Sequence, residues 1–240
     1  MSSDRFAIWA GLALFFAGLP HGAGDEQDGQ LRRISLAHAL GYLMVGAAVT
    51  GLFLTLPIAG LSLFIGLSGW HFARSECGLS PNNRYAIAGL AIGGSALFQP
   101  EATRNVFADV IAAQMPSFYV SILAISGLLG TGFALWAMAK RERGFGHSLL
   151  ALGAVVLLHP VLAVGLIFLT AHAIPLQQRQ AASYGKDSVL RAVAIPTVLA
   201  VSGAAIIIWG VTADAITVPV AIALSMGMAT PHMLTERLES

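Results

Sequence analysis

Residues 117–139 read SFYVSILAISGLLGTGFALWAMA and contain no charged side chain. An α-helix needs about 20 predominantly apolar residues to cross the ~30 Å hydrocarbon core of a bilayer. The stretch meets that requirement by itself, so it predicts a helix that spans a membrane. Gly127 and Gly130 share one face of that helix and predict a surface for close helix packing.

Apolar stretches of the same kind recur along the chain. Besides 117–139 they cover residues 6–20, 36–54, 57–73, 85–99, 189–211 and 215–232. The stretch 147–177 is too long for one span, at about 1.5 Å per residue, and short for two. Because Pro160 interrupts helical hydrogen bonding there, we expect either one long kinked helix or two short half-spans. The chain therefore predicts eight or nine membrane segments.

The composition also favours lipid as the solvent. The chain has 240 residues, of which 56% are hydrophobic and only 10% are charged. Soluble domains carry about 25% charged residues, so this chain has too little polar surface to coat a water-soluble globule. The net charge of +1 provides no basic field for nucleic acid. A single cysteine, Cys77, excludes a disulfide framework and a cysteine-based metal cage.

We predict an all-α, polytopic transmembrane helix bundle that forms one integral-membrane domain, residues 1–240, in the cell membrane. Residues 101–115 predict a short amphipathic helix that connects two spans at the membrane surface. The apolar start of the chain is followed by GLPHGAGDE, which lacks a small-x-small cleavage pattern. We therefore interpret the start as a first span and not as a cleaved leader. Positive charges fall on both sides of any eight-span arrangement and leave the orientation open.

Four of the seven histidines lie at or near the ends of predicted spans: His21, His71, His172 and His232. Ionisable groups in a membrane are costly and indicate function by default. The first and third spans run in the same direction, so His21 and His71 are expected at the same membrane face. If 147–177 forms two half-spans, His172 and His232 are expected there too. Four converging imidazoles suit Zn, Cu, Fe or Ni.

Two carboxylates follow the first two of these histidines at similar spacing. Asp25 comes four residues after His21, and Glu76 comes five after His71. A metal-bound imidazole usually donates its other N–H to a carboxylate, carbonyl or water, so both carboxylates fit that role. Capping of helix ends explains them almost as well. The other histidines, which we assign to packing, capping or the membrane interface, are His38, His147 and His159.

Four segments of the chain together resemble one known family. They are GLPHGAGD at 18–25, SGWHFARSE at 68–76, HPVLAVGLIFLTAHA at 159–173 and ATPHM at 229–233. This set is similar to the Brp/Blh family, the membrane β-carotene 15,15′-dioxygenases of bacteria and archaea that supply retinal to rhodopsins. The resemblance implies an all-helical, iron-dependent enzyme with histidine ligands. The positions that it matches to ligand histidines are His21, His71 and His172, with His232 in the C-terminal PHM motif.

The chain departs from the family pattern near two of these histidines. The family has HFGxxD after the third span, whereas this chain has Ala73 and Glu76. The family also tends to carry a second histidine four residues after the position of His172, where this chain has Leu176. Because residues four apart share a helix face, a pair of ligands is reduced to one. His232 or a carboxylate would then complete the ligand set.

The function implied by the resemblance is cleavage of β-carotene, or a related carotenoid, by O2 and Fe(2+) to give retinal. An apolar tunnel would hold one double bond near the iron. Its candidate lining is Trp70, Phe72, Tyr119 and Phe168, although ordinary packing explains such aromatic side chains equally. Expected partners are the carotenoid, O2, membrane lipid and, functionally, a retinal-binding rhodopsin. Two alternatives stay open: a membrane iron enzyme for another isoprenoid or lipid, and a non-catalytic protein that binds carotenoid or metal.

Overall fold

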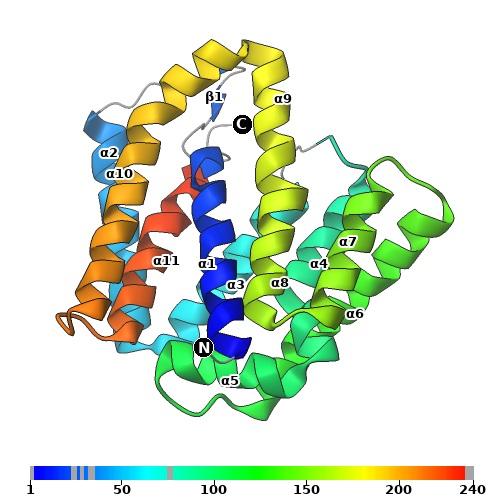
Figure 1. Cartoon of the computed structure of the whole chain (residues 1–240), viewed down its shortest axis with the longest axis horizontal. Coiled ribbons are helices and arrows are strands. Elements are labelled where there is room, and N and C mark those ends of the chain that lie inside the picture. The colour runs from blue at the N-terminus through cyan, green and yellow to red at the C-terminus, as the bar shows by residue number, and fades with distance from the viewer. Residues whose placement is uncertain (1–2, 23–25, 28–29, 32–35, 75–77, 236–240) are drawn as a thin grey trace. The chain divides into compact units, whose positions relative to one another are not determined.

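The computed structural model describes residues 3–22, 26–27, 30–31, 36–74 and 78–235 (Figure 1). The helices are α1 (Ser3–Gly22), α2 (Leu36–Thr55), α3 (Pro57–Arg74), α4 (Pro81–Phe98), α5 (Pro100–Ile111), α6 (Ser117–Ala139), α7 (Phe145–Leu157), α8 (Pro160–Ile167), α9 (Ile174–Tyr184), α10 (Lys186–Thr212) and α11 (Val218–Thr235). Between α8 and α9 lies a π-helix, η1 (Phe168–Ala173). A short ribbon pairs β1 (Glu26–Gln27) with antiparallel β2 (Gln30–Leu31). The predicted all-α class is confirmed apart from this ribbon.

The chain divides into two compact units. Unit 1 comprises residues 1–18 and 68–179, and unit 2 comprises residues 19–67 and 180–240. The helices α4 to α8 belong wholly to unit 1, whereas α2, α10 and α11 belong to unit 2. The division falls inside α1, α3 and α9, so each of these three helices contributes residues to both units.

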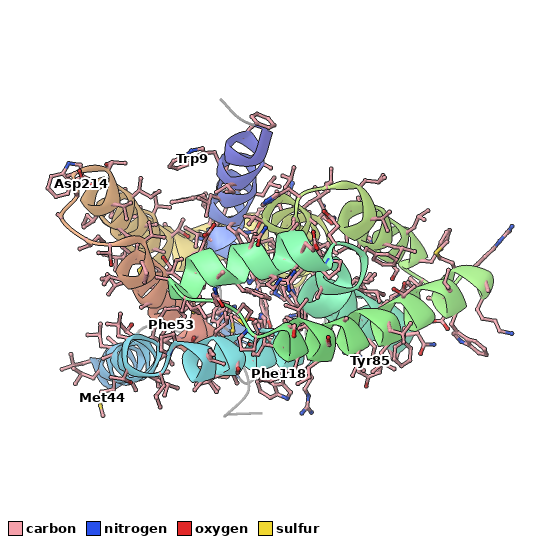
Figure 2. The ribbon with its side chains drawn as sticks, turned by 90° about the horizontal axis from the view of Figure 1, so that it is seen from below. Trp9, Met44, Phe53, Tyr85, Phe118 and Asp214 are labelled. Atoms are coloured by element: carbon pink, nitrogen blue, oxygen red, sulfur yellow. The ribbon has the colours of Figure 1, made fainter. Side chains whose placement is uncertain are left out.

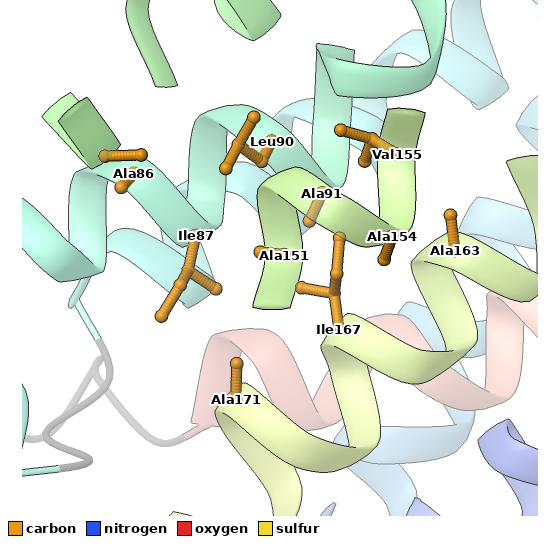
Figure 3. Packing of buried hydrophobic residues seen from close by; sticks show 11 residues of the cluster. Ala86, Ile87, Leu90, Ala91, Ala151, Ala154, Val155, Ala163, Ile167 and Ala171 are labelled. Atoms are coloured by element: carbon orange, nitrogen blue, oxygen red, sulfur yellow. The ribbon is translucent and has the colours of Figure 1, made fainter. Parts of the chain in front are cut away.

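Small side chains on α4, α7 and α8 form the core of unit 1 (Figure 3). Ala86 and Leu90 of α4, Ala151 of α7, and Ala163 and Ile167 of α8 are completely buried. Lipid tails are as apolar as leucine, so helices of this kind associate through close van der Waals packing. Alanine provides that closeness because it keeps neighbouring backbones near each other.

The closest helix contact in unit 1 joins α4 to α6, which lie side by side in Figure 1. A Cβ added at Gly89 would lie 2.7 Å from the Cα atom of Gly130, and one added at Gly130 would lie 2.6 Å from the backbone nitrogen of Leu90. Gly127 meets the backbone of Gly93 in the same way. The predicted packing role of Gly127 and Gly130 is therefore confirmed.

The helical structure is interrupted between α7 and α8, at His159 and Pro160. Pro160 has no N–H to continue the hydrogen bonds of α7, and His159 Nδ1 accepts a hydrogen bond from the backbone of α8 at 3.4 Å. The side-chain amide of Gln99 donates to the carbonyl oxygens of Val155, at 2.8 Å, and Leu158, at 2.7 Å. Gln99 thus satisfies two carbonyls at the C-terminal end of α7.

Both predicted alternatives for residues 147–177 are wrong in part. The break falls where Pro160 predicts it, and α7 is a short helix. After the break, however, α8, η1 and α9 continue as one stretch of 25 residues, Pro160–Tyr184, which is too long for a half-span. Proline is favourable in the first turn of a helix, so Pro160 begins this stretch and interrupts nothing after it.

The predicted amphipathic helix is present but shorter than expected. α5 ends at Ile111 because Ala112 adopts the left-handed conformation, with φ 50°. Its buried side packs against α4, α6 and α8 of unit 1, and Phe107 meets Tyr119 of α6 edge to face. Its location at a membrane surface stays a prediction.

In unit 2, α11 packs against α2 and α10 (Figure 1). A Cβ added at Gly46 of α2 would lie 2.8 Å from the carbonyl oxygen of Gly227 in α11, so the two backbones touch there. Thr50 Oγ1 adds a hydrogen bond to the carbonyl of Ala223 at 3.2 Å. Pro231 lies inside α11 and has no N–H for the Gly227 carbonyl one turn earlier. Contact with α2 therefore fixes the helix just before its proline.

Three helical stretches of the described chain are long and apolar enough to cross a membrane. They are α6, the continuous Pro160–Tyr184 stretch, and α10. Shorter apolar helices cover Phe6–His21, Ala39–Thr55, Phe145–Leu157 and Val218–Leu234. The fold is consistent with a helical membrane protein, whereas the number of spans and the single domain stay predictions.

Candidate metal centre

His71 and His172 lie against each other in unit 1. His71 is in the last turn of α3, and His172 is in η1. Their Nε2 atoms are 3.0 Å apart. Both side chains are buried, with 3% of His71 and 1% of His172 exposed. The two rings meet edge to face, with centroids 4.8 Å apart.

The distance between these nitrogen atoms fits a shared cation. Two imidazole nitrogens bound at right angles, each about 2.1 Å from an ion, are themselves about 3.0 Å apart. The same distance fits a hydrogen bond in which one Nε2–H donates to the other Nε2, since neutral imidazole can carry its proton on either nitrogen. The pair thus accommodates a proton or a metal ion, and neutral imidazole suits Zn, Cu, Fe and Ni.

The π-helix η1 determines how His172 projects. The N–H of Ile174 bonds to the carbonyl of Leu169, five residues back, where an α-helix would bond four back. Thr170 Oγ1 donates to the carbonyl of Leu166 at 2.7 Å, just before His172. Single wide turns of this kind are rare and occur frequently at functional sites. The sequence patterns used above do not reveal this turn, because period and propensity do not separate it from a regular α-helix.

Aromatic rings surround the imidazole of His172 within unit 1. The Phe72 ring meets it edge to face, with centroids 4.8 Å apart. The Phe168 ring lies at 6.1 Å and in turn packs on Phe15 at 5.3 Å. Gly18 of α1 lies directly against the Phe168 ring, where no larger residue fits without a shift. The histidine pair therefore has an apolar, aromatic neighbourhood.

A second pair of histidines lies in unit 2. His21 is in the last turn of α1, and His232 is in the last turn of α11. Their ring centroids are 5.0 Å apart and the ring planes are perpendicular, at 89°. Both side chains are buried, with 6% of His21 and 8% of His232 exposed. Each follows a proline within its helix, so the two Pro-His motifs of the sequence meet in space.

The other predicted site residues have different outcomes. Asp25 and Glu76 lie outside the described residues, as does the side chain of His38. His159 caps α8, as one of its assigned roles requires, and His147 is half-buried near the start of α7. The remaining residues lie as follows: Phe72 and Phe168 beside His172, Tyr119 against Phe107, and Trp70 under the Arg74 guanidinium.

Leu176 occupies the position where the resemblance leads one to expect another histidine. Its side chain is 1% exposed and lies four residues after His172. This position is therefore buried and apolar in this chain. Any further ligand for a metal held by His172 has to come from elsewhere.

The fold and the histidines define a class: a helical protein with long apolar segments and a buried pair of imidazoles that suits a metal ion. A family model described as beta-carotene 15,15′-dioxygenase matches residues 12–238, which is nearly the whole chain. The chain belongs to the beta-carotene 15,15′-dioxygenase family, as the four motifs predicted. No curated protein and no solved structure matches it. Membership supports a carotenoid dioxygenase type of function.

Proposed function

We propose that this protein is an iron-dependent membrane oxygenase that cleaves β-carotene, or a related carotenoid, with O2 at the central double bond to give retinal. The observation that carries the proposal is the buried pair of His71 and His172, whose Nε2 atoms are 3.0 Å apart. Family membership supports the carotenoid dioxygenase class. Iron, retinal as the product, delivery to a rhodopsin and a multi-pass location in the cell membrane are the finer parts of the proposal.

We further propose that His21 and His232 complete the ligand set. Support comes from α1, whose Gly18 lies against Phe168 within unit 1. The Phe168 ring is 6.1 Å from His172. His21 follows Gly18 by three residues, so it projects from the same face of the helix one turn later. His232 enters the set through its ring contact with His21 in unit 2. Asp25 and Glu76 are proposed to accept the outer N–H groups of the ligands.

The residues around the pair suit an oxygenase of an apolar substrate. A bound Fe(II) would supply the O2 chemistry that amino-acid side chains lack. His71 and His172 hold their Nε2 lone pairs toward one point while burial keeps water away from both rings. Phe72 and Phe168 offer apolar surface beside that point, which suits a polyene. We propose them, with Tyr119 and Trp70 farther out, as the lining of the substrate tunnel.

The proposed reaction balances without an electron donor. One carbon–carbon double bond breaks and two carbon–oxygen double bonds form. Each aldehyde product takes one atom of a single O2 molecule, so no proton or reductant is consumed. A lipid-soluble carotenoid would reach such a site from within the bilayer.

Leu176 favours one alternative function. Because a buried leucine replaces the further histidine of the family pattern, this chain offers fewer imidazoles to a metal. A protein that binds carotenoid without turnover would tolerate that loss. Such a protein would hold carotenoid intact in the presence of O2 and stoichiometric iron, which separates it from the oxygenase.

Expression in cells that accumulate β-carotene tests the proposal. The natural chain should convert the orange carotenoid to retinal, measured by chromatography of the extracted pigments, and should purify with iron. His71→Ala and His172→Ala should each remove iron and activity, because each deletes one of two imidazoles that face one point. His147→Ala is the matched control, since it also truncates a histidine but near the start of α7. Equal loss in all three variants, or full activity in the first two, contradicts the proposal.

A further inference from the structure

Hydrogen bonds join the start of α4 to the connection between α6 and α7 at one end of unit 1. Ser80, at the start of α4, donates through its hydroxyl to the carboxylate of Glu142, at 2.6 Å, in the connection from α6 to α7. Asn82 donates to the other carboxylate oxygen at 2.7 Å. The backbone N–H of Ser80 also donates to the carbonyl of Arg143 at 3.2 Å. The ends of α3 and α6 and the starts of α4 and α7 therefore lie at the same end of the unit.

Positive side chains gather at this end. Among the described residues there, only Glu142 is acidic, and hydrogen bonds from Ser80 and Asn82 hold its carboxylate. The same bonds lower the pKa of Glu142, so this one negative charge is kept but turned toward α4. The basic residues are Arg74, Arg84, Lys140, Arg141 and Arg143, all exposed except the half-buried Arg84.

The opposite end of unit 1 has a different balance of positive and negative side chains. It comprises α5 and its connections, which join the end of α4 to the start of α6. Its described charged side chains are Glu101, Arg104 and Asp109, and Arg104 lies 3.9 Å from Glu101 as an ion pair. The two ends of the helices therefore differ in sign, which the sequence does not reveal because loops from both units interleave along the chain.

Tryptophans mark the basic end as a membrane boundary. The Lys140 ammonium lies 5.3 Å from the ring centre of Trp136, and the Arg74 guanidinium lies 5.8 Å from that of Trp70. Each pair is four residues apart on the last turn of its helix. An aromatic ring with a cation beyond it is typical of the level where lipid tails meet headgroups.

The outer face of α6 leads to this boundary. Apart from Ser117 and Ser121, its exposed side chains are apolar as far as Trp136, and Figure 2 shows Phe118 projecting away from the neighbouring helices. The large exposed apolar residues along it are Phe118, Ile122, Ile125, Leu128, Leu129, Phe133, Leu135 and Trp136. Lipid tails suit this face, and Lys140 then lies where lipid phosphates begin.

We propose that the basic end of unit 1 binds the phosphate groups of anionic phospholipids in the leaflet that faces the cytoplasm. The inference rests on the membrane location proposed above and is independent of the reaction. Clusters of four or more Lys and Arg at the cytoplasmic ends of membrane helices bind acidic lipids. Each Lys or Arg near the membrane surface changes the affinity roughly fivefold. The cluster also orients the protein, because such loops are retained inside the cell.

Lipid selectivity tests the headgroup part of the inference. The full chain is reconstituted in vesicles of equal parts phosphatidylcholine and phosphatidylglycerol, with bromine on the tails of one lipid or the other. With Trp9→Phe and Trp209→Phe introduced into the otherwise natural chain, quenching of tryptophan fluorescence reports which lipid lies beside Trp70 and Trp136, the two tryptophans that remain. The natural chain should prefer phosphatidylglycerol. Combining Lys140→Gln, Arg141→Gln and Arg143→Gln should reduce that preference by at least about fivefold, without touching the carboxylate of Glu142.

A matched control removes a cation elsewhere. Arg104→Gln neutralises the described basic residue at the α5 end of unit 1 and should leave the preference unchanged. Equal quenching by the two lipids in the natural chain overturns the inference. So does an equal loss in the control. A chain recovered from the soluble fraction would overturn the membrane proposal as well, which distinguishes the two failures.

Labelling of single cysteines tests the orientation. In a Cys77→Ser background, Arg143→Cys marks the basic end and Ala113→Cys marks the exposed connection that follows α5. A membrane-impermeant maleimide should label only Ala113→Cys in intact cells and both variants after permeabilisation. Labelling of Arg143→Cys in intact cells overturns the inference.

Discussion

Replacing Thr170 by valine tests whether the wide turn η1 positions His172. Thr170 Oγ1 donates to the carbonyl of Leu166 at 2.7 Å. Valine has nearly the same shape but no donor, so the change removes one hydrogen bond, worth about 0.5–1.5 kcal/mol net. Thr131 makes the same bond to the carbonyl of Gly127, at 2.8 Å, in the regular helix α6. Thr170→Val and Thr131→Val should therefore lower the free energy of unfolding by similar amounts.

The two valine variants should differ in metal binding. Thr170 lies two residues before His172 in the π-helix, whereas Thr131 is far along the chain from any histidine. We expect Thr170→Val to weaken iron binding about tenfold, the lower end of the range for groups that orient ligands. Thr131→Val should leave it unchanged, and Thr170→Ser should restore it. Anaerobic titration of the purified chain with Fe(II) measures the affinity. Equal affinity in both valine variants, or no rescue by serine, refutes the reasoning.

Three further predictions follow from single contacts. Leu176→His should tighten iron binding, which a metal titration measures, because it places a second imidazole on the helix face of His172. Without metal, the same change should lower the free energy of unfolding by about 1–3 kcal/mol, because it buries a polar ring. Thermal unfolding measures this second effect. Gly130→Ala should cost about 1–3 kcal/mol of stability because its Cβ meets the backbone of α4. Gly132→Ala meets nothing within 4 Å and should instead stabilise α6 by up to about 1 kcal/mol in the same unfolding assay, because alanine favours helix more than glycine does. Hydrogen bonds lower the pKa of Glu142 in the folded protein. The ionised carboxylate therefore stabilises the fold at any pH above the pKa that Glu142 has in the unfolded chain, and this stabilisation is lost as the pH falls through its pKa in the folded protein. Glu142→Gln should remove this acid dependence of the unfolding temperature.

Much of the fold follows from the sequence because lipid imposes a simple rule. Every backbone polar group in a bilayer must be satisfied locally, so a long apolar stretch is read as a helix without further knowledge. The stretch 117–139 corresponds to α6 without any shift of its ends. The glycines at 127 and 130 predict where α6 meets α4, because only glycine permits backbones to touch at that spacing.

Two features of the site escape such rules. The π-helix η1 is one residue wider per turn than its surroundings, and its residues have ordinary helical propensity. Neither the period nor the propensity of the sequence therefore distinguishes it from a regular α-helix. The expectation of one kinked helix or two half-spans also did not include a full-length stretch after Pro160, which forms because proline favours the first turn of a helix.

The histidine pairs could be predicted from the sequence in part. Their positions at or near the ends of predicted spans selected these four histidines. His71 and His172 meet in unit 1, and His21 and His232 meet in unit 2. Pairing itself required coordinates, since 101 residues separate His71 from His172. The proposed roles of Asp25 and Glu76 stay predictions.

X-ray absorption at the iron edge of the purified, reconstituted chain tests the central claim most directly. If His71 and His172 hold the metal, the natural chain binds one iron, and the spectrum contains imidazole scattering with nitrogen atoms about 2.1 Å from the metal. The double variant His71→Ala with His172→Ala should retain the fold and bind no iron. A natural chain without iron, or an unchanged imidazole spectrum in the double variant, would contradict the account.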